Sequence, residues 1–575
     1  MTQEDQLVLR TQPRNSTVTQ AAFHVTSTVA NTTGGLARAG IATAQTCTNI
    51  AFETAKVVTK TGHKLTRAVT AGIGLPTIGV DISEFFSLTG IELGHGATNL
   101  SLKGTTEIVR VFQQFFGDPF TMELTKEIMK MLSAEISKTG KEMGMLEMWG
   151  YFGAWISLQK QTKLRWREEF IFPSVQQVIY SPKTVKEKKF KAPAIWKVVK
   201  RTFKHKPVQE TARETQFTQN PRDLIIKLDH YVKFANGCYG ERALEVMKGN
   251  TPLRSHSGEL NFYANYCGIA TSDIVYMSSL ETKSDVFNST YVPRFIISLD
   301  HSEKTIILAF RGTLSARDVI IDLSGELIEY FVDDNQPYLV HSGMLKVVAR
   351  ISAQDHSSGI FKRIKELLEK HPEYSLTLTG HSLGAGIASL LSILWADPHT
   401  CRTRKESGLP DRPMQVFAFA CPSIMDDRLS DLYSDLIFTV VIGWDWLARV
   451  GKAGVLELRD AAIKMKELSQ TDPDLYNSIS SGKCTKEQLD QLHELRYAVT
   501  LELNPNENNY NKIHPPGRVC WIYKSQSDPS VYAIYKVLNR GKLFGEILFD
   551  DNMLDHHQPT SYDQVFEQML QQSSI

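Results

Sequence analysis

The sequence predicts an α/β fold, in which a mostly parallel sheet is covered by helices on both faces and is preceded by a mainly helical region. Strand-like and helix-like runs alternate from about residue 220 onward. Within that part, the β-branched and apolar run 375–379 leads into the pentapeptide Gly-x-Ser-x-Gly, and a helix-like pattern of small and apolar residues follows. Alternation of this kind indicates parallel strands, because each parallel connection needs a crossover, usually a helix.

Short apolar runs mark the other expected elements. We expect a helix at 228–235 and strands at 295–299, 305–310, 415–420, 436–442 and 545–549. The runs 295–299 and 305–310 are separated by a polar turn and are predicted to pair. Arg311-Gly312-Thr313 follows the second of them directly, at a strand end where α/β enzymes place backbone that contacts ligands.

Ser382 stands at the centre of the pentapeptide, between Gly380 and Gly384. A strand, a sharp turn and a helix around such a serine are typical of a nucleophile elbow, which lifts the hydroxyl to the top of a sheet. Side chains at the two glycines would collide with the neighbouring strand and helix. The backbone N–H of Leu383, at the N-terminus of the following helix, is expected to stabilise an oxyanion. The alternative is a structural serine in a glycine-rich turn.

A serine nucleophile needs a histidine base and a carboxylate that orients it, and on this type of sheet they follow in the order Ser, Asp or Glu, His. Asp445 comes just past the apolar run 439–442, as an orienting carboxylate should. The last histidines of the chain are His556 and His557. Adjacent side chains cannot both face the site, and the residues alone do not choose between them.

The composition is that of a soluble globular protein, with 42% hydrophobic and 22% charged residues and a net charge of +1. Nothing in this balance selects nucleic acid as a partner. The seven cysteines are scattered and form no Cys-x-x-Cys pair, which argues against a zinc site and for a reducing compartment. We expect no metal and no cofactor. Neither a signal peptide nor a transmembrane span is evident, so the expected protein is intracellular and not secreted.

The first part of the chain divides into a polar tail at 1–20 and an apolar region at 21–120 that is expected to contact lipid. Residues at 25–73 recur with a period of eleven, which gives a helix whose apolar stripe barely drifts. This stripe resembles the eleven-residue amphipathic repeats of perilipin-type lipid-droplet coat proteins. Weak apolar stripes suit loosely packed lipid surfaces. The alternative is a helical hairpin that packs on the rest of the chain.

Residues 121–210 are expected to be helical and to end in a basic, aromatic linker. The stretch 121–153 predicts one long amphipathic helix and its continuation. Ten lysines and arginines lie at 183–206, with Trp196 and Phe203 among them. Lysines that flank large apolar side chains suit an anionic membrane surface. A solvated linker and a nucleic-acid contact are the alternatives, in that order.

Several motifs together resemble the class 3 lipase family, which has the α/β-hydrolase fold. They are Phe310-Arg311-Gly312-Thr313-Leu314-Ser315, the elbow at 380–384, the segment around Asp445 and the ending His-x-Pro. Within this family the sequence is most similar to the sn-1-specific diacylglycerol lipases, at 310–323, 341–344, 515–519 and 544–547. The resemblance covers about 220–575, which is the expected catalytic domain.

The resemblance implies a role for each candidate residue. Ser382 would be the nucleophile, Asp445 the orienting carboxylate, and His557, two residues before the proline, the base. Thr313 and Leu383 would supply the oxyanion N–H groups. The family usually has Pro-Arg after the triad aspartate, where this chain has Ala448-Arg449. That departure removes no reactive group.

An insertion at about 452–512 separates Asp445 from His557. It is charged and predicts helices at 455–468 and 486–501. Diacylglycerol lipases carry a variable regulatory loop in the same interval, so the resemblance implies a segment that gates the site. The alternative is a surface excursion, which costs little stability because long loops close cheaply.

The expected function is hydrolysis of an acyl ester of a neutral glycerolipid, diacylglycerol above all, at a membrane or lipid-droplet surface. A phospholipase A1 or a mono- or triacylglycerol lipase would use the same triad. A non-catalytic scaffold on a lipid surface is the rival of a different class. An intact triad argues against a scaffold, which needs none of these residues.

Overall fold

The computed structural model describes residues 130–140, 143–178, 221–248, 258–279, 292–312, 326–332, 336–353, 356, 358–500, 512–526 and 528–572. Four features expected from the sequence lie outside these residues. They are the tail at 1–20, the stripe at 25–73 with the rest of 21–120, the basic segment at 183–206, and Thr313.

A nine-stranded sheet forms the centre of the fold, in the order β1-β13-β12-β11-β10-β7-β4-β3-β2. Its strands are β1 (Val175–Val178), β2 (Ile274–Met277), β3 (Phe295–Asp300), β4 (Thr305–Phe310), β7 (Ser375–His381), β10 (Met414–Phe419), β11 (Ile437–Ile442), β12 (Arg518–Lys524) and β13 (Tyr532–Val537). The neighbours from β4 through β12 pair in parallel. Both edges, β2-β3-β4 and β12-β13-β1, are antiparallel. The sheet is therefore mixed rather than mostly parallel, and its parallel part is the middle.

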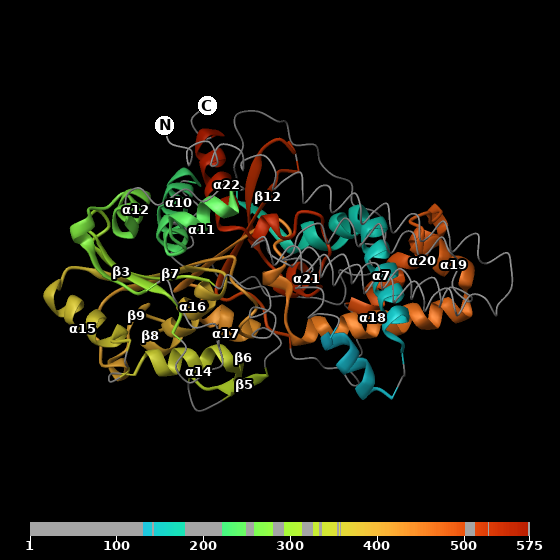
Figure 1. Ribbon diagram of the computed structural model, residues 1–575, viewed down its shortest axis with the longest axis horizontal. Helices are drawn as coiled ribbons and strands as arrows, with labels where there is room; N and C mark the ends of the chain where they lie inside the picture. Colours follow the sequence, from blue (N-terminus) through green and yellow to red (C-terminus); the bar gives the residue numbers. More distant parts are fainter. Residues whose placement is uncertain are drawn as a thin grey trace, which may run out of the picture. The chain divides into compact units, whose positions relative to one another are not determined.

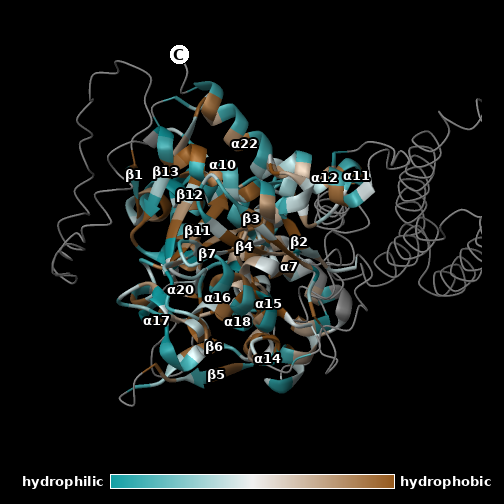
Figure 2. Ribbon diagram, turned by 90° about the vertical axis from the view of Figure 1, so that its left-hand side faces the viewer, coloured by the Kyte–Doolittle hydropathy of each residue, from teal (hydrophilic) through white to brown (hydrophobic). Residues whose placement is uncertain are grey.

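Helices cover both faces of this sheet, as the alternating pattern predicts. One layer holds α10 (Pro221–Gly237), α12 (Gly258–Cys267) and α22 (Pro559–Gln572), and the other holds α14 (Ser342–Ile351), α15 (Ile360–Lys370) and α16 (Leu383–Trp395) (Figure 1). The view in Figure 2 shows the same two layers, with apolar strand residues between them. Tyr231 of α10 stacks on Phe417 of β10 with ring centroids 4.3 Å apart. Such contacts bury the sheet on both sides, so its functional groups lie at strand ends.

Most of the expected elements are present. The paired strands at 295–299 and 305–310 are β3 and β4, and 415–420 and 436–442 are β10 and β11. The prediction of a strand at 545–549 is wrong. Helix α21 (Arg540–Phe544) ends just before this run, and the chain continues without regular structure. Ile547 and Phe549 are buried, so this run is apolar because its side chains pack and not because its backbone pairs.

The sheet begins earlier in the chain than the expected domain boundary near 220. Strand β1, at 175–178, pairs antiparallel with β13 and forms one edge of the sheet. The stretch expected to form one long helix and its continuation, 121–153, is described from 130 to 140 and from 143 onward, and it contains two helices. A helix covers 130–138, Gly140 has a φ of +68°, and α7 (Met145–Trp166) follows. A positive φ ends a helix, and glycine adopts it at no steric cost.

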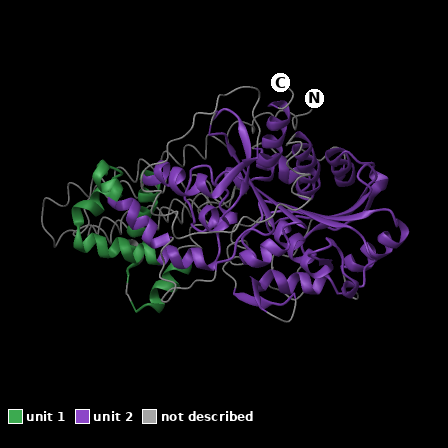
Figure 3. Ribbon diagram, turned by 180° about the vertical axis from the view of Figure 1, so that it is seen from behind, with its two compact units in different colours: residues 1–161, 460–490 green, residues 162–459, 491–575 purple. Residues whose placement is uncertain are grey.

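The chain divides into two compact units, one of residues 1–161 and 460–490 and one of 162–459 and 491–575 (Figure 3). The insertion contains α18 (Lys452–Thr471), α19 (Pro473–Ser480) and α20 (Lys486–Thr500). In the first unit, the Ser157 hydroxyl of α7 donates to the Ile479 carbonyl of α19 over 2.6 Å. The second unit contains the whole nine-stranded sheet. Nowhere in the described ranges is a helix long and apolar enough to span a membrane.

Candidate active site

Ser382 lies in a sharp turn between β7 and α16. Its φ of 60° and ψ of −131° are strained for a residue with a side chain. A Cβ at Gly380 would lie 2.4 Å from the Gly384 carbonyl carbon, and one at Gly384 would lie 2.3 Å from the Phe310 carbonyl oxygen. Both glycines are therefore required by close backbone approach. The turn has the geometry of a nucleophile elbow.

Ser382, His557 and Asp445 lie within hydrogen-bonding distance of one another in series. His557 Nε2 is 3.1 Å from the Ser382 hydroxyl oxygen, and Nδ1 is 2.9 and 3.1 Å from the two carboxylate oxygens of Asp445. A carboxylate only accepts, so Nδ1 carries the proton and Nε2 is free to accept the serine proton. Asp445 is fully buried. This arrangement can deprotonate the serine hydroxyl as an acyl carbonyl is attacked.

Two further groups fix the Asp445 carboxylate. The Leu447 N–H donates to Oδ1 over 2.9 Å, and the Tyr562 hydroxyl donates to Oδ2 over 3.1 Å. Tyr562 is on α22 and is completely buried. Burial and the adjacent carboxylate raise its pKa well above the ordinary value, which keeps it a donor. The sequence did not indicate this tyrosine, because Asp445 lies 117 residues away from it in the chain.

His556 faces away from the serine. Its Nδ1 accepts the Trp444 N–H over 3.0 Å, and its ring packs so closely on Gly443 that a Cβ there would be 2.6 Å from it. Burial lowers the pKa of His556, which agrees with a neutral ring that accepts a hydrogen bond. The structure thus places His557 in the site, whereas His556 contacts the loop before Asp445.

His381, directly before the serine, forms part of the site floor. Its Nδ1 lies 2.9 Å from the Tyr239 hydroxyl, and it is buried. Burial, followed by the nearby His557, lowers the pKa of His381 well below its ordinary value. A neutral ring next to His557 adds no charge that would oppose protonation of the base.

Of the two residues expected to supply oxyanion N–H groups, the structure describes Leu383. Leu383 is the first residue of α16, and N–H groups in the first turn of a helix have no intrahelical acceptor. A Cβ on Gly312 would lie 2.8 Å from the Ser382 Cβ, so the backbone of the Arg-Gly segment passes directly beside the nucleophile. Thr313 follows that glycine but lies outside the described residues. Its role stays a prediction.

A mixed sheet under two helical layers, a serine elbow and a Ser–His–Asp series are the features of the α/β-hydrolase class of serine hydrolases. Residues 307–453 match the family described as Lipase (class 3). That match begins within β4 and includes the elbow at Ser382 and the Asp445 loop. This part of the chain is a class 3 lipase domain, as the sequence motifs predict.

The curated relatives match a longer stretch at lower similarity. Diacylglycerol lipase-alpha of Rattus norvegicus is 25% identical over 311 residues, which cover 50% of this chain and 28% of the relative. Diacylglycerol lipase-beta of Mus musculus is 27% identical over 181 residues, which cover 31% of this chain and 25% of the relative. The chain thus spans about a quarter of the length of these relatives.

Solved fungal lipases resemble parts of the fold. A mutant form of MDLA from Penicillium cyclopium is 16% identical, with a TM-score of 0.35, and the match covers 60% of this chain and 98% of that one. The triacylglyceride lipase of Rhizomucor miehei is 18% identical, with a TM-score of 0.32, and the match covers 58% of this chain and 93% of that one.

Proposed function

We propose that the chain is a serine lipase that hydrolyses an acyl ester of a neutral glycerolipid, with diacylglycerol as the preferred substrate. The observation that carries this proposal is the Asp445–His557–Ser382 series at a strained elbow inside a class 3 lipase domain. Diacylglycerol is the preferred candidate because both relatives described above are diacylglycerol lipases by name.

In the first half-reaction, His557 Nε2 takes the Ser382 proton while Oγ bonds to the ester carbonyl carbon. The resulting oxyanion is stabilised by the Leu383 N–H and, we infer, by the N–H of Thr313. The carbon–oxygen bond to the glyceride then breaks, and His557 gives its proton to the departing alkoxide. Asp445 keeps the imidazole oriented and stabilises its positive charge throughout.

In the second half-reaction, water attacks the acyl-enzyme. His557 takes a proton from that water and returns one to Ser382 Oγ, which leaves as the free hydroxyl. The products are a fatty acid and the deacylated glyceride. Bonds and protons balance with water as the only co-reactant, so the reaction needs no cofactor.

A panel of glycerolipids in mixed micelles tests the substrate. Purified full-length protein should release fatty acid fastest from diacylglycerol, and less readily from mono- and triacylglycerol and from phosphatidylcholine. Faster release from phosphatidylcholine would favour a phospholipase A1, and faster release from mono- or triacylglycerol would favour those activities. No release from any ester by folded protein would favour a non-catalytic scaffold.

We also propose that the protein works at an intracellular membrane or lipid-droplet surface, held there by the stripe at 25–73 and the basic segment at 183–206. Two weak signals together give stable but reversible attachment. Each lysine or arginine near an anionic surface contributes about 1 kcal/mol, which salt weakens, whereas apolar burial persists in salt.

Two variants of the full-length protein test this attachment by flotation with anionic vesicles. One lacks residues 25–73, and the other has the basic residues of 183–206 changed to glutamine. Each should float less than the unchanged protein. Only the loss of 25–73 should reduce binding at high salt. Binding that survives both changes together would place the attachment elsewhere, for example at the rim of the active site.

A further inference from the structure

The segment from 545 to 557, which carries His557, is held by side chains rather than by the sheet. Its only regular structure is a 3-10 turn at Asp555–His557. It therefore has no strand ladder to fix its position. Two of its four acidic residues, Glu546 and Asp550, are nevertheless buried, 7% and 6% exposed. A buried charge must be paired, so the partners of these two carboxylates determine where the segment lies.

Glu546 is bound by Arg496, which lies in α20, the last helix of the insertion. Arg496 Nε donates to Oε1 over 3.1 Å, and Nη2 donates to Oε2 over 2.8 Å. Both side chains are buried. A bidentate pair of this kind fixes orientation as well as distance, because both groups are planar.

Arg496 is itself held by the last turns of α7. Its Nη1 donates to the Thr162 hydroxyl over 2.9 Å, and its guanidinium carbon lies 4.1 Å from the centre of the Trp166 ring. Lys163, which follows Thr162 on α7, forms an ion pair with Asp550. All of these residues belong to the second compact unit. The segment is therefore bound at two points, by Lys163 of α7 at Asp550 and by Arg496 of α20 at Glu546.

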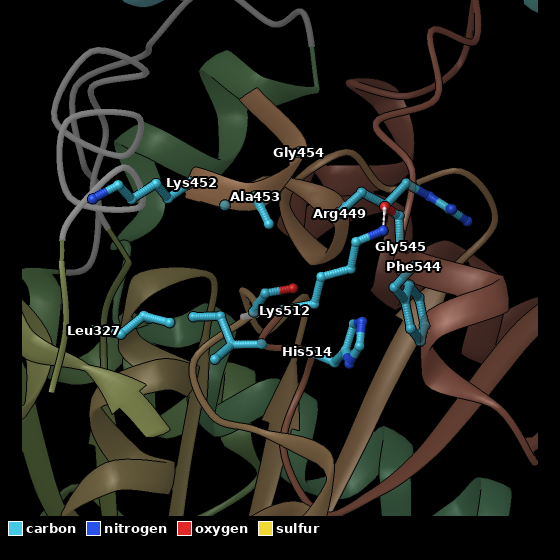
Figure 4. A pocket seen from close by; sticks show the side chains of 12 residues that line it. Leu327, Arg449, Lys452, Ala453, Gly454, Lys512, His514, Phe544 and Gly545 are labelled. Atoms are coloured by element: carbon cyan, nitrogen blue, oxygen red, sulfur yellow. Dashed lines mark hydrogen bonds between the residues drawn. The ribbon is translucent and has the colours of Figure 1, made fainter. Parts of the chain in front are cut away.

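The start of the segment has further backbone contacts. Figure 4 shows the Lys512 amine at the Gly545 carbonyl, a hydrogen bond of 3.2 Å, with Arg449 and Phe544 beside it. Arg449, from the loop after Asp445, donates to the Leu543 carbonyl. The loop of the triad aspartate is thereby tied to α21, the helix that directly precedes the segment of the triad histidine.

We propose that Arg496 is a positioning residue for His557, so that α20 of the insertion supports the triad. The inference rests on the proposed function, because it assigns Arg496 to that same site. A buried ion pair is a poor source of stability, since apolar residues of similar volume often stabilise a protein as well or better. The pair instead fixes the orientation of the segment that carries His557. Thr162, Lys163 and Arg496 all lie outside the matched family region, 307–453.

The test is the rate at which full-length protein reacts with a small fluorophosphonate, together with kcat and KM on a short soluble ester. Arg496→Lys keeps the charge but loses the bidentate geometry, and we expect its reaction to be slower by about 10²-fold, with kcat lowered and KM unchanged, because a misplacement of about 1 Å can cost that much. Arg402→Met is the matched control. It removes a bidentate pair with Asp411 that is exposed, and it should react at the unchanged rate.

A double variant, Arg496→Met with Glu546→Met, separates an effect on the position of His557 from an effect on the stability of the protein. We expect its melting temperature to stay near that of the unchanged protein while its reaction stays slow. Full recovery of the rate in this variant, or an unchanged rate in folded Arg496→Lys, would overturn the inference and leave the proposed function intact. An unchanged protein that does not react with the probe at all would overturn the proposed function, and the inference with it.

Discussion

Replacing Ser382 by alanine is expected to abolish both fluorophosphonate labelling and ester hydrolysis. The elbow presents the serine hydroxyl oxygen to His557 Nε2 at 3.1 Å, where the base can take its proton. Loss of a triad nucleophile typically lowers kcat by several orders of magnitude. The fold should persist, because the change removes one oxygen and keeps the Cβ. Labelling with the probe, fatty-acid release and thermal unfolding measure the three quantities.

Ser389 provides a matched control for that experiment. It lies on α16, is buried like Ser382, and donates its hydroxyl to the Ala385 carbonyl over 2.8 Å. Ser389→Ala should therefore be labelled and active at close to the unchanged rate. A Ser382→Ala protein that is still labelled would show that another residue is the nucleophile and that the elbow is structural.

The parts of the site that could be predicted from sequence are those with a local signal. Gly380, Ser382 and Gly384 lie within one pentapeptide, and Asp445 follows a strand whose apolar run is continuous. In each case the residues that define the feature are neighbours in the chain. The central strands were predicted for the same reason, because a buried parallel strand is an uninterrupted apolar run.

What could not be predicted depends on contacts between distant residues. The Tyr562 hydroxyl meets Asp445 across 117 residues, and Arg496 meets Glu546 across 50. No periodicity in either segment reveals such a pair. Strand β1 was missed because its four residues, Val-Gln-Gln-Val, are too few and too polar to be distinguished from a loop, and only β13 gives them a partner.

The choice between the two histidines shows the same limit. Physical reasoning on the sequence leaves His556 and His557 open, and family resemblance implies His557. The structure gives each ring a distinct set of partners: Ser382 and Asp445 for His557, and the Trp444 N–H for His556. The difference is set by the 3-10 turn at Asp555–His557, which rotates consecutive side chains apart. The segment that contains this turn is held by residues distant in the chain, Lys163 and Arg496, so the local sequence does not show which histidine faces the serine.

These partners predict opposite outcomes for two alanine variants. His557→Ala removes the base that faces Ser382, and we expect it to lower kcat on a soluble ester by several orders of magnitude, as far as Ser382→Ala does. The melting temperature should change little, because the His557 side chain is partly exposed, at 13%. The pair of measurements, kcat and thermal unfolding, should therefore show lost activity in a stable protein.

His556→Ala should show the reverse. It leaves the Trp444 N–H without its acceptor and empties the space beside Gly443, which together should cost about 1–3 kcal/mol of unfolding free energy. The Ser382–His557–Asp445 series keeps all of its own contacts, so kcat per folded molecule should stay within about tenfold of the unchanged protein, a barrier change of up to about 1.4 kcal/mol. An active His557→Ala protein beside an inactive but folded His556→Ala protein would mean that the base is His556 and that the register of the triad is off by one residue.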